Sequence, residues 1–272
     1  MHGYTEAMPE LPDIETFKRY LDGTSLRQKI RRVRVTKERT LKDVSSRQIA
    51  KALQSRSFCA SARHGKYLAA ALDDGKQLVL HFGMTGYLQY AQEDEPDSPH
   101  ARVIITFENG RRLDYDNKRM LGRVRLVDDF GALIEQLRLG PDALQVSPAH
   151  FDERLREHAG AIKSTLMNQA IVAGLGNTYT DEIPFQARIH PATPVARLDD
   201  RERRTIYRMM LKVLHKAIAV ETDRSRLPRS YLIPHRYAGA PCPRGNGVVQ
   251  QTHVAGRAAY FCPQCQPRRD KT

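Results

Sequence analysis

Two residues near the start of the chain, Pro9 and Glu10, directly follow a methionine, Met8. Methionine is readily removed before a small residue such as proline, so a chain that begins at Met8 would expose the secondary amine of Pro9. An α-amino group titrates near ~8, so part of it is neutral at physiological pH and can attack a sugar C1′ to form a Schiff base. Glu10 is placed to protonate a ring oxygen or to carry protons. The alternative is structural, because proline and acidic residues are also typical of a helix start.

A glycine-rich segment lies in the middle of the chain, where Gly174, Gly176 and Asn177 occur within Ile171–Glu182. The glycines permit a tight turn and a close approach of the backbone to a ligand. Asn177 would then lie at a helix start, where free N–H groups and the helix dipole attract a phosphate. An ordinary corner between two helices is the alternative.

Three cysteines near the C-terminal end, Cys242, Cys262 and Cys265, have the spacing of a zinc-binding module. The second pair is a good zinc knuckle, but Gly245 stands where the first pair needs its second thiolate. The sequence therefore predicts a zinc finger that has lost one ligand. Cys59 lies far from these residues, and we expect it to be a buried thiol.

The composition limits the classes of protein to which the chain can belong. It has 272 residues, 40% of them hydrophobic, which is enough for about two folded domains with real cores. No run of about 18 apolar residues is present, so no membrane helix is expected. Glu6 and Pro9 stand where an export signal would be apolar, and export is therefore not expected. The 44 Lys and Arg against 31 Asp and Glu give a net charge of +13, which favours a polyanionic partner, with nucleic acid as the first candidate.

The first half of the chain has mainly β-strand patterns after one helix, which is expected over residues 12–22. Short apolar runs are separated by turn sequences such as Asp73-Asp74-Gly75 and Glu108-Asn109-Gly110. Strands are expected at the segments Val33–Val35, Tyr67–Leu72, Leu78–Phe82, Val103–Phe107, Arg111–Tyr115 and Val124–Val127. Several short strands joined in this way are typical of a β-sandwich.

The middle third has helical patterns and begins after a boundary at Gly140-Pro141-Asp142. Ser147 followed by Pro148 predicts a helix N-cap with proline in the first turn. Two short helices interrupted at Gly160 are expected next, and a longer amphipathic helix is expected over residues 200–221.

These features together resemble the formamidopyrimidine-DNA glycosylase / endonuclease VIII family of base-excision repair enzymes. The resemblance extends from Met8 to about Gln266 and rests on the order of the Pro-Glu start, the Gly-Leu-Gly-Asn turn and the cysteine module. It implies an α+β fold in three parts. These are an N-terminal catalytic β-sandwich with an N-terminal helix (residues 8–135), a helix–two-turn–helix DNA-binding domain (145–235) and a C-terminal zinc-finger-like β-hairpin (238–268).

The resemblance also implies an activity, that of a bifunctional DNA-formamidopyrimidine glycosylase and DNA-(apurinic or apyrimidinic site) lyase. Such an enzyme flips a damaged base out of double-stranded DNA, cuts the glycosidic bond and nicks the strand by elimination. Pro9 would be the Schiff-base nucleophile and Glu10 its acid/base partner. Lys66 matches a hairpin lysine that holds the phosphate beside the lesion, and we count it with the catalytic group. Asp13 stands where many relatives have Glu.

The remaining matched residues imply contacts with DNA. Met84, within His-Phe-Gly-Met-Thr-Gly, would fill the space left by the flipped base, and Arg119 lies in a loop that probes the opposite strand, with Met120 or Leu121 as a second wedge. The full predicted DNA-binding set is His81, Met84, Arg119, Lys163, Asn177 and Arg257. The predicted metal ligands are Cys242, Cys262 and Cys265, with Zn²⁺ held weakly because Gly245 replaces the fourth ligand; His253 or water is the candidate replacement.

We expect a monomer that binds damaged double-stranded DNA, has no membrane partner and is cytoplasmic and nucleoid-associated. The Schiff-base chemistry requires that Pro9 be the first residue, and we expect translation to begin at Met8. If the residues before Met8 are retained, Pro9 is blocked, and the alternative is a catalytically silent homologue that binds damaged DNA.

Two features disagree about the preferred lesion. The Pro-Glu-Leu-Pro start favours oxidised purines, whereas the stretch from Asp223 to Pro241 is short compared with the loop that helps to enclose an oxidised purine, so the preferred lesion stays open.

Overall fold

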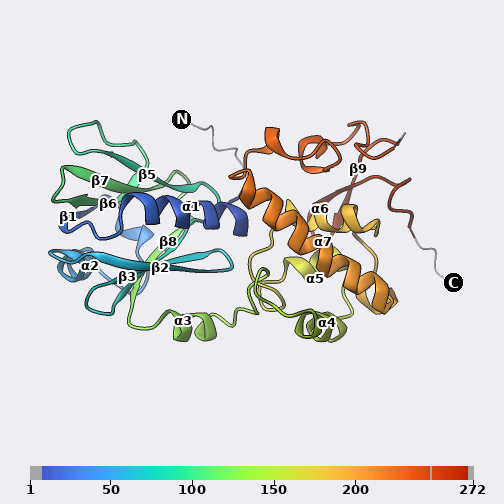
Figure 1. The fold of residues 1–272 in the computed structure, drawn as a ribbon, viewed down its shortest axis with the longest axis horizontal. Coiled ribbons are helices and arrows are strands. Elements are labelled where there is room, and N and C mark those ends of the chain that lie inside the picture. The colour runs from blue at the N-terminus through green and yellow to red at the C-terminus, as the bar shows by residue number, and fades with distance from the viewer. Residues whose placement is uncertain (1–7, 246, 269–272) are drawn as a thin grey trace. The chain divides into compact units, whose positions relative to one another are not determined.

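The computed structural model describes residues 8–245 and 247–268 (Figure 1). Residues 1–7, which bear on the two candidate translation starts and include Glu6, lie outside the described residues. The chain forms two compact units, and the boundary between them falls between Leu137 and Arg138.

The first unit is built on two four-stranded antiparallel sheets, which confirms the predicted β-sandwich. One sheet has the order β1 (Ile30–Val35), β6 (Ala101–Phe107), β7 (Arg111–Asn117), β5 (Gly86–Gln92). The other has the order β2 (Phe58–His64), β3 (Tyr67–Leu72), β4 (Gln77–His81), β8 (Arg123–Val127). Side chains from both sheets meet in one hydrophobic core, in which Leu68, Leu80, Val103 and Leu113 are buried.

Helix α1 (Leu11–Thr24) packs against strands of both sheets. Ile14, Phe17 and Leu21 recur at helical spacing and are buried in the sandwich core, so this face fixes the position of the helix start. The other helices of the unit are α2 (Ser46–Leu53), the 3₁₀ turn η1 (Glu38–Thr40) and α3 (Phe130–Gln136).

Cys59 corrects one prediction, because its side chain is exposed and not buried. It lies next to Phe58 at an irregularity in the pairing of β2 with β3, between Phe58 and Ala60. Strand β2 is at the edge of its sheet, and side chains of a strand alternate between two faces. Phe58 points into the core and Cys59 away from it.

The second unit contains the four helices α4 (Pro148–Arg156), α5 (Ile162–Met167), α6 (Tyr179–Ala187) and α7 (Asp200–Ala219), with 3₁₀ turns η2 (Val195–Arg197), η3 (Arg224–Arg226) and η4 (Ile233–His235). Ser147 is the N-cap of α4, as predicted, and its hydroxyl accepts a hydrogen bond from the backbone N–H of His150 at 3.2 Å. None of the helices in the described part of the chain is long and apolar enough to cross a bilayer.

A two-stranded hairpin, β9 (Gln250–Val254) and β10 (Arg257–Phe261), completes the second unit. We call residues 238–268, which contain this hairpin and three cysteines, the finger. Its small core packs on Phe185 of α6 and also includes Leu232 and Val249. The finger is therefore fixed to the same helix that follows the Gly-Leu-Gly-Asn turn.

Candidate active site and nucleic-acid interface

The start of α1 holds Glu10 in a defined place. The backbone N–H of Glu10 donates to Oδ2 of Asp13 at 2.8 Å, and the backbone N–H of Asp13 donates to the carbonyl of Glu10 at 2.9 Å. Such a reciprocal cap satisfies donors that a helix start otherwise leaves open. Glu10 is only 2% exposed, whereas Pro9 beside it is half-buried. Asp13, which has a shorter side chain than Glu, is thus suited to anchor its neighbour Glu10.

Lys66 lies at the tip of the hairpin that joins β2 to β3, next to Gly65. Gly65 has a φ of 54° and is the first of the two turn residues, the position where a type II′ turn requires glycine. Burial lowers the pKa of the Lys66 ammonium, and the negative charges of Glu10 and Asp13 oppose that shift. The fold therefore brings Lys66 to the start of α1, although these residues are far apart in the sequence.

His81 belongs to the same group of residues. It ends β4, pairs with Tyr67 of β3 and Arg123 of β8, and its ring lies 4.8 Å from the Tyr67 ring. Burial, together with the positive charges of Lys66, Arg123 and Arg125, lowers the pKa of His81 to about 4. The imidazole is neutral at physiological pH, so it can act as a hydrogen-bonding group near Lys66 without adding charge.

Two loops carry the residues expected to replace a flipped base, and they lie side by side. Gly83 has a φ of 61°, and a Cβ atom at this position would lie 2.5 Å from backbone atoms of Leu121 and Gly122, so only glycine fits. The backbone N–H of Arg119 donates to Oγ1 of Thr85 at 3.0 Å. Met84 lies between Gly83 and Thr85 in sequence, so its backbone is held beside the second loop.

The exposure of these side chains favours a role at the surface. Met84 is half-buried and belongs to none of the hydrophobic clusters found among the described residues. Arg119 is exposed, and Leu121 is 43% exposed, unusually open for a large apolar side chain. Met120 is less exposed and has a φ of 51°, which turns the chain between them. Of the two candidates for the second wedge, Leu121 has the more accessible side chain.

The turn before α6 places Asn177 near the N-terminal end of that helix, as predicted, two residues before Tyr179. The Gln169 amide braces the turn, donating to the carbonyl of Leu175 at 2.7 Å and accepting from the backbone N–H of Gly174 at 3.0 Å. Gly174 has a φ of 116°. Oδ1 of Asn177 is buried and has no hydrogen-bond partner among the described residues.

Lys163, which the sequence places among the DNA-binding residues, lies inside the second unit and not on its surface. Its side chain is fully buried, and its ammonium donates to Asp181 at 2.7 Å and to the carbonyl of Asn177 at 3.2 Å. An unpaired buried ammonium would be costly, so the lysine is held by its carboxylate partner. Sequence reasoning missed Asp181, although it lies within the quoted Ile171–Glu182 segment. It missed Arg236 as well, because nothing in its local sequence distinguishes it from other arginines.

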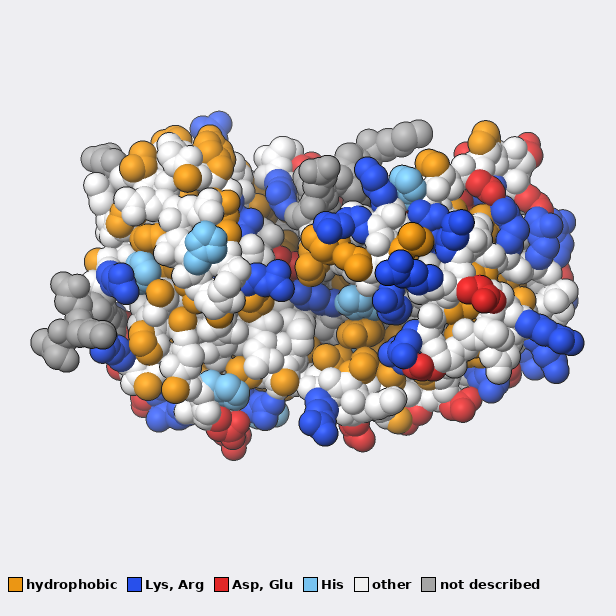
Figure 2. Space-filling model, turned by 180° about the vertical axis from the view of Figure 1, so that it is seen from behind, with side chains coloured by type: hydrophobic (Ala, Val, Ile, Leu, Met, Phe, Trp, Pro, Cys, Tyr) orange, Lys and Arg blue, Asp and Glu red, His pale blue; other side chains and the backbone are white. Residues whose placement is uncertain are grey.

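Arg257 is exposed and directly follows the turn of the finger hairpin. Both turn residues, Ala255 and Gly256, have positive φ values of 49° and 73°, as a type I′ turn requires. Arg257 pairs across the hairpin with Val254. Its guanidinium is thus presented to solvent by a tight hairpin. Lys and Arg side chains also cover more of the face shown in Figure 2 than Asp and Glu side chains do.

The three predicted metal ligands lie together. The Sγ atoms of Cys242, Cys262 and Cys265 are within 4.8 Å of one another, and those of Cys242 and Cys265 are 3.6 Å apart. Zinc–sulfur bonds of about 2.3 Å in a tetrahedron put the sulfurs ~3.8 Å apart, so the cluster fits three corners of a zinc site. At the sequence position of the missing thiolate, a Cβ on Gly245 would have no atom within 4 Å.

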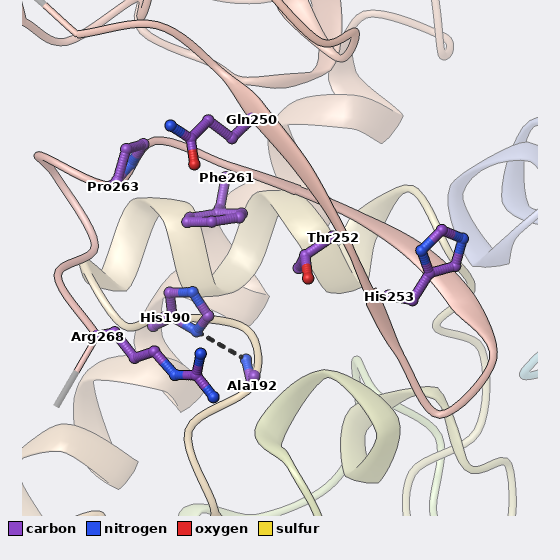
Figure 3. A pocket seen from close by; sticks show the side chains of 8 residues that line it. All are labelled: His190, Ala192, Gln250, Thr252, His253, Phe261, Pro263 and Arg268. Atoms are coloured by element: carbon purple, nitrogen blue, oxygen red, sulfur yellow. Dashed lines mark hydrogen bonds between the residues drawn. The ribbon is translucent and has the colours of Figure 1, made fainter. Parts of the chain in front are cut away.

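His253, a candidate replacement ligand, lies outside the described cysteine cluster. It lines a hollow of about 350 Å³ beside the hairpin, together with residues such as His190, Phe261 and Arg268 (Figure 3). Nδ1 of His190 accepts a hydrogen bond from the backbone N–H of Ala192 at 3.1 Å. The described residues therefore supply three cysteine ligands at this site.

Comparison with known proteins agrees with this fold. The family model of the formamidopyrimidine-DNA glycosylase N-terminal domain matches residues 8–124, and that of the H2TH domain of the same glycosylase matches residues 139–228. Formamidopyrimidine-DNA glycosylase of Thermus thermophilus is 35% identical over 275 residues, covering 95% of this chain and 98% of the relative. That of Chloroflexus aggregans is 32% identical over 271 residues, with the same coverage.

Solved structures show the same likeness. The Lactococcus lactis Fpg in complex with DNA containing an abasic site has a TM-score of 0.86 at 30% identity, covering 95% of this chain and 100% of the other. The same protein in complex with DNA containing FAPY-dG has a TM-score of 0.86 at 29% identity, with the same coverage. The fold and the site thus define a two-unit DNA repair glycosylase with a finger. The chain belongs to the formamidopyrimidine-DNA glycosylase family.

Proposed function

We propose that the protein excises damaged bases from double-stranded DNA and then nicks the strand at the resulting abasic site. The observation that carries this proposal is the convergence of Lys66 and His81 on the start of α1, where Glu10 is buried beside Pro9. The relatives bound to damaged DNA support the same activity. A silent DNA-binding homologue is not favoured, because the catalytic Pro-Glu pair and its surroundings are all present.

In the reaction that we propose, the neutral amine of Pro9 forms a bond to C1′ while the bond from C1′ to the base breaks. Glu10 protonates the ring oxygen as the sugar opens to the Schiff base, and the base leaves with a proton. Loss of a C2′ proton then expels the 3′ phosphate by elimination, which nicks the strand. Water hydrolyses the Schiff base and frees Pro9.

The proposed DNA contacts are both polar and apolar. We propose that Lys66, Asn177 and Arg257 hold phosphates, and that Met84 and Leu121 fill the space of the extruded base. Residues 8–135 would supply the chemistry, and residues 145–235 and 238–268 would grip the duplex. The protein would act as a monomer on nucleoid DNA in the cytoplasm.

We further propose that Cys242, Cys262 and Cys265 hold Zn²⁺, which would brace the finger and not take part in the reaction. With Gly245 in place of a fourth thiolate, affinity should be lower than in a four-cysteine site. Dialysis against a mild chelator followed by metal analysis should leave less than one zinc per chain. Full retention of one zinc would contradict the weakened site.

The direct test is borohydride trapping on a duplex with an abasic site, using protein that begins at Pro9. A covalent adduct is expected, and protein that begins at Met1 should give none because its Pro9 nitrogen is in an amide bond. Mass spectrometry of the native protein should find Pro9 as its first residue. Parallel duplexes with 8-oxoguanine or thymine glycol would identify the preferred lesion. The absence of an adduct with protein that begins at Pro9 would contradict the proposed chemistry.

A further inference from the structure

A fully buried carboxylate in α6, Asp181, binds two cations at once. Its Oδ1 accepts from the Lys163 ammonium at 2.7 Å, and its Oδ2 accepts from Nε of Arg236 at 2.8 Å. Both side chains of the Lys163–Asp181 pair are 0% exposed. Removing one partner of a buried ion pair leaves an uncompensated charge, so the three groups constrain one another strongly.

Both cations also reach the same backbone atom, the carbonyl oxygen of Asn177. Nζ of Lys163 donates to it at 3.2 Å and Nη2 of Arg236 donates to it at 3.3 Å. A carbonyl oxygen has two lone pairs, and two donors occupy them here. Asn177 is thereby held in place by its main chain, while its side-chain Oδ1 has no partner among the described residues.

Arg236 also extends this network to the finger. Its guanidinium carbon lies 4.8 Å from the centre of the Tyr260 ring, on the strand that begins with Arg257. A guanidinium is planar, so it can stack on a ring and still donate hydrogen bonds in its own plane. One side chain thus contacts the Asn177 turn, α6 and the finger hairpin.

We propose that Asp181 and Arg236 are positioning residues that hold Asn177 where its side chain can bind the DNA backbone, with the Tyr260 ring of the finger bracing Arg236. This inference rests on the proposed function, since Asn177 is the phosphate contact through which both residues act. Neither residue needs to contact DNA itself: Asp181 is buried, and the Arg236 side chain is 20% exposed, with Nε and Nη2 both donating hydrogen bonds within the protein.

The test is a double-mutant cycle measured by binding to a duplex that contains tetrahydrofuran, an abasic-site analogue that cannot form the Schiff base. Arg236→Lys keeps the charge but cannot make all three contacts, so it should weaken binding by about tenfold, the cost of one hydrogen bond to a charged group. Asn177→Ala should weaken binding by a similar factor. Because Arg236 acts through the Asn177 side chain, Arg236→Lys should add almost nothing in the Asn177→Ala background.

Arg244 offers a matched control. It belongs to the finger, its guanidinium carbon lies 5.6 Å from the centre of the Phe185 ring, and it donates to the carbonyls of Phe185 and Gln186 near the C-terminal end of α6. Arg244→Lys should leave binding of the tetrahydrofuran duplex within about twofold of wild type, since a surface contact contributes little.

Thermal unfolding of each variant verifies that it is folded. Should Arg236→Lys fail to fold, Tyr260→Leu removes the stacked ring and leaves both ion pairs, and the same non-additivity with Asn177→Ala is expected.

The outcomes separate the two proposals. Equal losses from Arg236→Lys in the wild-type and Asn177→Ala backgrounds would show independent effects and overturn the positioning role, as would no loss at all. If the wild-type protein binds abasic and undamaged duplexes equally and traps no adduct, the proposed function fails and this inference fails with it. If the wild-type protein traps the adduct normally but the losses from Arg236→Lys and Asn177→Ala are additive, only the positioning role is rejected and the proposed function stands.

Discussion

The backbone N–H of Arg119 donates a hydrogen bond to the Thr85 hydroxyl at 3.0 Å. This bond joins two loops that the sequence separates by more than thirty residues. One loop carries Met84 and the other the 43% exposed Leu121, and Gly83 and Gly122 bring the backbones of the two loops into contact. Two apolar side chains on adjoining loops are suited to enter the space that a flipped base leaves.

Leu121→Ala should slow excision of a damaged base more than Met120→Ala does, because Leu121 has the more exposed side chain. We expect about a tenfold loss in single-turnover rate, equivalent to ~1.4 kcal/mol of lost stabilisation of the extruded state. Met120→Ala is the matched control in the same loop. A larger loss from Met120→Ala would make Met120 the second wedge instead.

Glu10→Gln should bind abasic-site duplexes nearly as well as wild type but lose at least about a hundredfold in the rate of base release. The amide has the shape of the carboxyl group but cannot transfer its proton. Single-turnover kinetics on a lesion-containing duplex measures this loss. Glu15→Gln, one turn further along α1 where Glu15 pairs with Arg63 at 2.8 Å, should keep the wild-type rate. Unchanged base release by Glu10→Gln would remove Glu10 from the chemistry.

Lys66→Ala should weaken duplex binding and flatten its dependence on salt. Loss of one phosphate contact lowers the slope of log K against log salt by about 0.9. Titrations between low and moderate salt measure the slope. Lys76→Ala changes a lysine in the β3–β4 hairpin turn, where Lys76 pairs with Asp128 at 3.1 Å, and should leave the slope unchanged. An unaltered slope for Lys66→Ala would exclude Lys66 from the phosphate contacts.

The neutral state of His81 should make the first unit sensitive to acid. Its pKa is about 4 in the folded protein and near 6.5 when unfolded, so the unfolded state binds the proton more readily. Stability is therefore full above the unfolded pKa and falls as the pH drops from 6.5 towards 4, by roughly 2 kcal/mol at pH 5. Urea unfolding at pH 7 and pH 5 should show a smaller loss for His81→Gln than for wild type. An NMR titration of His81 with a midpoint near 6.5 would contradict this.

Gly245→Cys should restore a fourth thiolate and raise zinc affinity by at least about tenfold. The substitution has room, because a Cβ at this position meets no atom within 4 Å. Chelator competition measures the affinity, and the absorption spectrum of the cobalt-substituted protein reports four sulfur ligands. Gly245→Ala is the control and should leave the affinity unchanged. Equal zinc retention by both variants would mean that the fourth ligand comes from elsewhere.

Elements with a strong apolar repeat and clear end signals could be predicted from sequence. The helix expected over residues 12–22 is α1, and the one expected over residues 200–221 is α7 (Asp200–Ala219). Strand β2 was not predicted, because Phe58–His64 consists mostly of small and polar residues without apolar alternation. Helix α2 was missed as well, since Ile49 and Leu53 are its only buried residues and too few to show a repeat.

The parts of the site that depend on partners far away in the sequence could not be predicted from the sequence. A lysine pattern cannot show that Lys163 is buried against Asp181, eighteen residues further on. The same limit applies to Arg236, whose partners come from α6 and β10. By contrast, the places of Glu10 and Asn177 at helix starts follow from local signals that a single sequence contains.

The exposure of Cys59 has a practical consequence. Of the four cysteines in the chain, it is the exposed one, whereas Cys242 and Cys262 are buried and Cys265 is half-buried in the finger cluster. A maleimide dye added to the folded protein should therefore couple first at the edge of the sandwich. Such a dye lies at the end of the β2–β3 hairpin opposite the turn that carries Lys66, so it would label the first unit without occupying that turn.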